Sequence, residues 1–212
     1  MFKRYLRVGA IAALLVCSLG PRAAPADDYK RGLFDYQRGD LAAAMTTLRG
    51  AATAGHAPSQ ALLGFILDRA DFSTEALALY RDAAAQNDAE GHAGLASLYL
   101  TGRGIAKDEK LAFVHFSKAA ELGHANSIEA LASAYLNKQL GLDPDGRDAA
   151  AGQAALRRAA ERGHLASAEA LARAYRSGGF GVAADPAQAA TWEARATELR
   201  KQNAAPNAKA AR

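Results

Sequence analysis

Apolar and polar residues recur along the chain at a spacing typical of stacked helical units. One phrase consists of an alanine pair, two further residues, a turn residue, a polar residue and a small or apolar residue. It begins at Ala51, Ala83, Ala119 and Ala159, in steps of 32, 36 and 40 residues. Periods of this length are typical of proteins that repeat one supersecondary unit.

Two further phrases flank each alanine pair and predict two amphipathic helices in every unit. After the pair, a leucine is followed by glycine or alanine, and three residues later by Leu67, Tyr99, Tyr135 or Tyr175. These positions share one face of a helix, which we name helix A. Before the pair, a small residue and then Leu48, Tyr80, Phe116 or Leu156 mark a second helix, which we name helix B.

The capping residues agree with this division. The candidate N-caps of helices B are Asp40, Ser73 or Thr74, Asp108 and Asp185. Pro186 stands at the first position of the last helix, where proline is tolerated. Because one pair of helices cannot bury both of its faces, the units must stack. The sequence therefore predicts an all-α fold, an α-solenoid of five helix-turn-helix units over residues 27–200, with Trp192 on the buried face of the last helix.

Residues 1–26 have the three-part pattern of a secretory signal peptide. Lys3, Arg4 and Arg7 precede an apolar run over residues 8–20, and Ala24-Pro25-Ala26 is a small-x-small cleavage site. We expect cleavage after Ala26 and a periplasmic or secreted location. An uncleaved N-terminal anchor is the alternative, although the apolar run is shorter than the roughly 20 residues that a membrane span needs.

Composition changes the picture once this segment is set aside. The formal charge of +4 belongs to residues 1–26, which hold four basic residues and no acid, so the remainder is balanced. A balanced chain gives no reason to expect nucleic-acid binding. Cys17 is the only cysteine, so residues 27–212 have neither a disulfide nor a thiol nucleophile. Residues 201–212 are basic and polar and contain Pro206, and we expect a disordered tail there.

The residues that could carry chemistry form no recognisable site. His56, His124 and His164 occupy one repeat position, so stacking separates them by about 10 Å, too far to share one metal ion. His92 and His115 belong to different helices of one unit, without a third ligand. Residues 143–148 resemble a calcium loop but lack its third acid and final glutamate. We therefore expect no enzyme activity, cofactor, metal or small-molecule substrate.

The third unit resembles the Sel-one-like repeat (SLR) family, a relative of the tetratricopeptide repeats. The resemblance rests on Leu95-Ala96, Tyr99, the glycine turn at residues 102–104, Lys110-Leu111-Ala112, Phe116, Lys118-Ala119-Ala120 and Gly123-His124-Ala125. It extends over about residues 29–200 and resembles exported bacterial members in particular. Two departures are the missing glycine turn at residues 68–72 and the extra residues at 137–147.

The resemblance implies a non-catalytic protein-interaction module, an adaptor, scaffold or regulator of the bacterial periplasm that meets membranes only through its protein or peptide partners. The alternative is a permanent component of an envelope machine, such as a flagellar motor or a polysaccharide-export complex. Family geometry places helix A on the concave side, although the sequence leaves open whether the concave or the convex face binds. The candidate contacts are Phe65, Glu129, Ser133, Glu169 and Arg173. This stripe changes from apolar to charged, which predicts a partner with one apolar end and one basic or polar end.

Overall fold

The structure is a computed structural model that describes residues 24–142 and 148–210, with side chains described as far as Asn203. Most of the expected signal peptide and most of the segment that resembles a calcium loop lie outside the described residues. Cleavage after Ala26 and the turn at residues 143–147 therefore stay predictions. None of the helices in the described ranges is long and apolar enough to cross a membrane.

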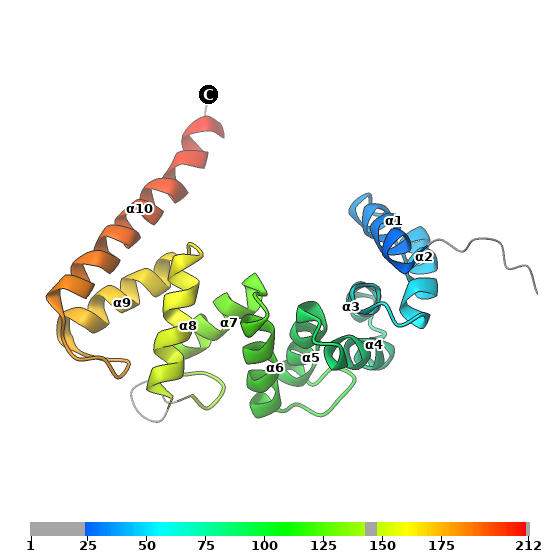
Figure 1. The fold of residues 1–212 in the computed structure, drawn as a ribbon, viewed down its shortest axis with the longest axis horizontal. Coiled ribbons are helices and arrows are strands. Elements are labelled where there is room, and N and C mark those ends of the chain that lie inside the picture. Colours follow the sequence, from blue (N-terminus) through cyan, green and yellow to red (C-terminus); the bar gives the residue numbers. More distant parts are fainter. Residues whose placement is uncertain (1–23, 143–147, 211–212) are drawn as a thin grey trace, which may run out of the picture.

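The described residues form helices in five pairs, each a helix A followed by a helix B (Figure 1). The pairs are α1 (Pro25–Gln37) and α2 (Leu41–Thr53), α3 (Ala57–Arg69) and α4 (Ser73–Ala85), α5 (Ala89–Thr101) and α6 (Glu109–Glu121), α7 (Ala125–Leu136) and α8 (Ala149–Glu161), and α9 (Leu165–Ser177) and α10 (Pro186–Ala210). The predicted α-solenoid of five helix-turn-helix units is confirmed.

Aspartates cap three of the helices B, as expected. Asp40 accepts a hydrogen bond from the Ala43 amide at 3.0 Å, and Asp108 accepts from the Leu111 amide at 2.9 Å. Asp185 accepts from the Gln188 amide at 3.1 Å, beside Pro186 at the start of α10. Such caps satisfy amide groups that have no partner within the helix.

The expected cap of α4 was wrong. Phe72 occupies the N-cap position and makes no side-chain cap, whereas Ser73 donates its hydroxyl to the Asp68 carboxylate at 2.8 Å. Asp68 is buried and also pairs with Arg103 of the next unit. The turn has no glycine, and Asp71 takes the left-handed conformation instead, with φ of 65°. The carboxylate of Asp68 therefore draws the hydroxyl away from the helix end.

Two large apolar cores run along the described part of the array and meet in the third unit, and a smaller cluster consists of Ala134, Tyr135 and Leu142. The N-terminal core joins α2 to α5 through buried residues that include Leu48, Leu63, Leu67, Tyr80 and Leu95. The C-terminal core joins the end of α6 to α10 through residues that include Leu131, Leu156, Leu171 and Trp192. Trp192 is 7% exposed, as expected for the closing helix.

The links between helices differ at the two edges of the array. Every link from a helix B to the next helix A has three residues: 54–56, 86–88, 122–124 and 162–164. The links from helix A to helix B vary: 38–40, 70–72, 102–108, 137–148 and 178–185. The unequal repeat steps of the sequence therefore arise in the A-to-B links, while the helices up to α9 keep 12 or 13 residues.

The last helix differs from the expectation for the chain end. We expected disorder over residues 201–212, but α10 continues without a break to Ala210 and has 25 residues. Alanine is the strongest helix former, and four alanines lie between residues 204 and 210, beside Pro206.

Candidate interaction surface

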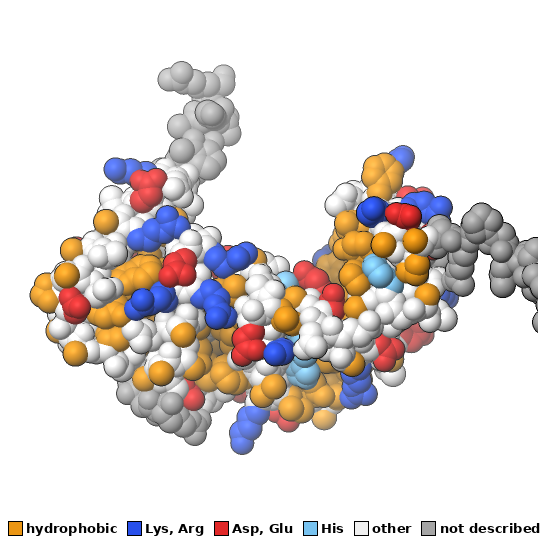
Figure 2. All heavy atoms as spheres, in the orientation of Figure 1, with side chains coloured by type: hydrophobic (Ala, Val, Ile, Leu, Met, Phe, Trp, Pro, Cys, Tyr) orange, Lys and Arg blue, Asp and Glu red, His pale blue; other side chains and the backbone are white. Residues whose placement is uncertain are grey.

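The array bends into an open arc whose two ends, α1 and α10, rise on the same side (Figure 1). Successive helices A pack on one another at α1–α3, α3–α5 and α7–α9, whereas no successive helices B in the described part pack comparably. Closer spacing of the helices A places them on the inner side of the bend. We call the space that they enclose with the two ends the hollow, which is visible in the space-filling view (Figure 2).

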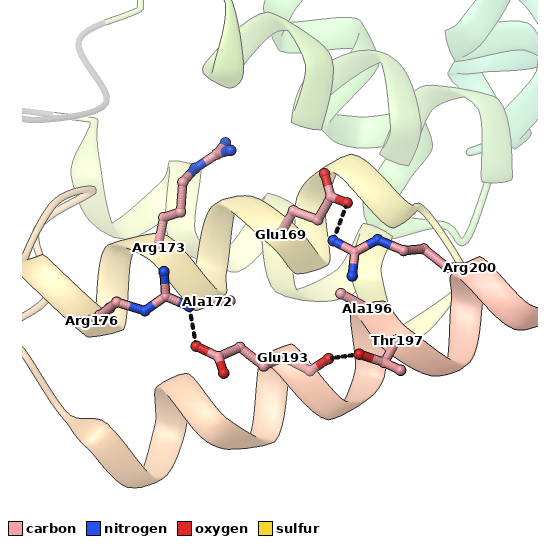
Figure 3. A pocket seen from close by; sticks show the side chains of 8 residues that line it. All are labelled: Glu169, Ala172, Arg173, Arg176, Glu193, Ala196, Thr197 and Arg200. Atoms are coloured by element: carbon pink, nitrogen blue, oxygen red, sulfur yellow. Dashed lines mark hydrogen bonds and ion pairs between the residues drawn. The ribbon is translucent and has the colours of Figure 1, made fainter.

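A polar groove lies between α9 and α10, at the C-terminal wall of the hollow (Figure 3). Its volume is about 390 Å³. It is lined by Glu169, Ala172, Arg173, Arg176, Glu193, Ala196, Thr197 and Arg200. Basic and acidic side chains also alternate over this end of the molecule in Figure 2.

Two ion pairs cross this groove, and the guanidinium of Arg173 belongs to neither of them. Arg200 donates to Glu169 at 2.7 Å, and Arg176 pairs with Glu193. Arg173 is exposed, and no partner is found for it among the described residues. It points to the same side of α9 as Glu169 (Figure 3). With three arginines and two glutamates, the groove carries one positive charge that nothing in it balances.

The N-terminal wall of the hollow is aromatic. Phe65 of α3 is 39% exposed, and its ring meets the edge of Tyr36 of α1, with 5.9 Å between ring centroids. The Arg69 guanidinium lies 5.7 Å from the centre of the Phe65 ring. Phe34, on α1, is also exposed and carries Arg38 over its ring. These contacts order the aromatic side chains without burying them.

The five residues singled out from the sequence do not form one cluster. Glu169 and Arg173 line the groove together, while Phe65 lies at the opposite end of the hollow. Glu129 and Ser133 are on α7 between them, the first exposed and the second half-buried. Ala61, four residues before Phe65 on α3, is buried in the second unit.

The sequence reasoning missed the partners that decide the charge of this surface. Arg176, Glu193 and Arg200 complete the groove, and Phe34 and Tyr36 complete the aromatic wall. Glu193 and Arg200 are seven residues apart on α10 and so share one face, which is the only signal that could have indicated them. The expectation of a basic partner end rested on two glutamates of the stripe, Glu129 and Glu169. Because Arg200 already pairs with Glu169, only Glu129 still supports it.

The family comparison follows the same division into units. The model of the Sel1 repeat matches residues 58–88, 89–124 and 166–199. The chain carries Sel1 repeats. The first and fourth units lie outside the matched stretches, and the fourth contains the longest A-to-B link, residues 137–148.

Solved structures with Sel1-type folds are similar over most of the chain. A protective antigen from uropathogenic Escherichia coli strains, which displays an SLR fold, is 26% identical with a TM-score of 0.67. The match covers 82% of this chain and 38% of the antigen. A Sel1 repeat protein from Oxalobacter formigenes is 25% identical with a TM-score of 0.62, covering 85% of this chain and 74% of that protein.

A curated relative is similar over a shorter stretch. An uncharacterised protein of Neisseria meningitidis serogroup B is 34% identical over 111 residues, which are 52% of this chain. The match covers 23% of the relative, so this chain spans less than a quarter of that protein's length.

The histidines at one position of the repeated unit are bonded within their own turns. His56, His124 and His164 each bond through Nδ1 to a serine hydroxyl three residues on, at 2.9, 2.7 and 2.7 Å. The serines, Ser59, Ser127 and Ser167, are fully buried. Each pair satisfies a buried hydroxyl at the start of a helix A, which gives these histidines a structural role. No group of three or more potential metal ligands is found among the described residues.

The third unit replaces this pair and adds a different one. Asp88 stands where the histidine would be and accepts from the Gly91 amide at 2.8 Å. Within the same repeat, His92 of α5 and His115 of α6 approach to 3.0 Å between their Nδ1 atoms. Tyr99 stacks on the His115 ring, with 5.6 Å between ring centroids. This polar contact lies where the two apolar cores meet.

Burial sets the charge of the His92–His115 pair. It lowers the pKa of His92, with Lys118 as a second cause, and it lowers the pKa of His115, with His92 as the second cause. The His92 Nε2 atom is buried and finds no partner among the described residues. The neutral forms of both rings are therefore favoured in the folded chain.

Proposed function

We propose that this chain is a non-catalytic protein-interaction module of the bacterial periplasm, and that a segment of its partner lies in the hollow. Sel1 repeat proteins generally mediate protein–protein interactions. The observation that supports the hollow as the site is its lining. It has an exposed aromatic wall at one end, the exposed side chains of Glu129 and Arg173, which have no partner in the described part of the chain, and a groove at the other end. The pattern of residues 1–26 supports export.

Site-specific photo-crosslinking tests the face. A photoreactive phenylalanine analogue replaces Ser133 in the hollow, and in a matched variant it replaces Ala154, which is exposed on α8 on the outer side. Proteins are crosslinked in intact cells that express the full chain. We expect one discrete crosslinked product at position 133 and none at 154. Products at 154 alone would place the binding face on the helices B.

Purification separates a transient regulator from a permanent component of an envelope machine. A transient partner dissociates when the crosslinker is omitted and the salt is raised to about 0.5 M, since screening at that concentration weakens exposed charge contacts. Recovery of the partner at fixed stoichiometry under those conditions would favour the envelope-machine alternative. Mass spectrometry of the same material tests export, with Asp27 expected at the N-terminus.

A further inference from the structure

We propose that the groove between α9 and α10 binds an acidic peptide segment of the partner, with Arg173 as the residue that receives its carboxylate. This inference rests on the proposed function, because it names the chemistry of the segment that lies in the hollow. It replaces the basic end that the sequence stripe suggested.

The charge of the groove is the first argument. Glu169 and Glu193 are each engaged by an arginine, so neither is free for a basic partner. Arg173 has no such carboxylate, although it is exposed on the same wall. A guanidinium has five N–H donors in a planar fork that matches a carboxylate. The group that suits Arg173 is therefore a planar anion.

The two ion pairs are the second argument, because a ligand can share them. Arg176 and Arg200 are 62% and 57% exposed, so water screens both pairs. Each guanidinium keeps donors that its glutamate does not use. A second acidic side chain of the same peptide would therefore find Arg176 or Arg200 within the groove, while Ala172 and Ala196 form a small apolar part of the lining.

The scale of the site favours a peptide over a polyanion. A groove of about 390 Å³ holds one or two side chains, and the basic residues at the opposite wall, Arg38 and Arg69, lie over aromatic rings. Residues 27–212 have equal numbers of basic and acidic residues, so no extended field attracts nucleic acid. The exposed Phe65 at the other end offers a contact for an apolar side chain, which a peptide has and a polyphosphate lacks.

Three labelled peptides of about twelve residues test the proposal, identical except for one triplet: Asp-Glu-Asp, Asn-Gln-Asn or Lys-Arg-Lys. Each has one phenylalanine at the far end of a Gly-Ser spacer. Their affinities for the mature chain are measured by fluorescence anisotropy at about 50 mM salt, where screening is weak. We expect the acidic peptide to bind about tenfold more tightly than the amide peptide, and the basic peptide to bind weakest.

Arg173→Gln is the decisive variant, and Arg81→Gln is its matched control. Arg81 is exposed on α4, outside the groove, so its removal changes the net charge equally. We expect Arg173→Gln to bring the acidic peptide down to the affinity of the amide peptide, with an unchanged melting temperature. Arg81→Gln should leave the preference intact. Equal effects of the two variants would overturn the assignment to Arg173.

Glu193→Gln gives an independent reading, since it frees Arg176 from its internal carboxylate. Affinity for the acidic peptide should rise about threefold, whereas Glu75→Gln, which removes an exposed acid from α4, should change it little. No rise, or a fall, contradicts a groove that shares its arginines. An oligonucleotide of about twelve bases that binds as tightly through Arg173 would also overturn the peptide assignment.

The outcomes keep the two proposals apart. If the acidic and amide peptides bind equally while crosslinking at position 133 still finds a partner, the hollow remains the binding face and the groove is not its acid receptor. If crosslinking at position 133 finds nothing, the proposed function fails, whatever the peptides do.

Discussion

In three of the helices B, the carbonyl near the helix end meets a different side-chain donor in the two halves of the array. In the N-terminal half, the buried amide of Gln60, on the next helix A, donates to Ala52 O at 3.1 Å. In the C-terminal half, an arginine from the next helix B reaches back instead. Arg158 donates to Ala120 O and Arg195 to Ala160 O, both at 3.3 Å. All three carbonyls belong to the second alanine of the repeated pair.

The comparison shows that the carbonyl at one repeat position can accept its hydrogen bond from two kinds of side chain, a neutral amide or a charged guanidinium. A neutral buried amide contributes through its hydrogen bond and its packing, and salt leaves that contribution unchanged. A partly exposed guanidinium at a helix C-terminus contributes through charge, and salt weakens it. The two halves should therefore lose stability under different conditions, although their apolar faces follow one pattern.

The largest effect is expected at the closing helix of the C-terminal core. Trp192→Ala removes a ring that is 7% exposed, and it should lower the free energy of unfolding by about 3–5 kcal/mol. Phe34→Ala, at the opposite end of the array, removes a ring that is 54% exposed and should change it by about 0.5 kcal/mol or less. Chemical denaturation followed by circular dichroism measures both. Equal losses would mean that α10 does not close the core.

A smaller effect is expected from the buried amide of the N-terminal half. Gln60 donates to Ala52 O and accepts from the Gln86 amide at 2.9 Å, so Gln60→Ala leaves a carbonyl without this donor. Ala52 O keeps its hydrogen bond from the Gly55 amide at 3.0 Å, so the loss should be about 0.5–1.5 kcal/mol and the same at low and high salt. Gln86→Ala removes an exposed side chain from the same contact and should have less effect. A loss that depends on salt would argue against the buried-amide account.

The arginine that replaces it in the C-terminal half should matter less and should respond to salt. Arg195→Gln should lower the free energy of unfolding by about 0.3–1 kcal/mol at low ionic strength, since it removes a cation from a helix C-terminus. Arg195 also donates to Glu161 O at 2.9 Å, which supports this end of α8. The difference from the parent protein should shrink in about 0.5 M salt, where charges are screened. A loss that persists unchanged there would point to packing of the arginine stem instead.

The stability of the boundary between the two halves should depend on pH. His92 and His115 have lowered pKa values, so near and below their ordinary value of 6.5 the unfolded chain binds more protons than the folded one. Stability from this pair is therefore complete well above pH 6.5 and is lost as the pH falls through 6.5 toward the lowered values. Asp88 opposes the shift of His92, and Lys118 reinforces it.

Melting temperatures between pH 7.5 and 5 measure this dependence. The double variant His92→Gln, His115→Gln should flatten the curve between pH 7 and 5. The Glu90 pKa is lowered from 4.5 by a hydrogen bond from His124, so the stability from that carboxylate is lost only below 4.5. Restricting the titration to pH 5 and above therefore separates the two contributions. A parent protein with the same melting temperature throughout that range would contradict the neutral pair.

The apolar phrases of the sequence were sufficient to predict the fold because burial follows the helical period directly. Leu48, Leu156 and Trp192 are buried as their repeat positions require. The predicted cap of α4 was wrong because the Asp68 carboxylate accepts the hydrogen bond from the Ser73 hydroxyl. The same carboxylate pairs with Arg103, 35 residues later in the sequence. Local propensity contains no information about such a partner.

The candidate site was predictable only in part for the same reason. Its helices A follow from the repeat, but the charge of the C-terminal groove depends on Arg200 meeting Glu169 across 31 residues. A stripe drawn on helices A alone counts Glu169 as a free acid. Only the packing of α10 against α9 shows that the free charge is Arg173.

The fixed links between a helix B and the next helix A have a consequence for how such a chain can change. Three residues join these helices at every junction, whereas the links at the opposite edge range from residues 38–40 to residues 137–148. Insertions at the variable edge leave the stacking of the units untouched, and lengthening a surface loop costs little conformational entropy. That edge is therefore the place where relatives can diverge and where a foreign loop can be grafted, while an added residue at the other edge would shift every following unit.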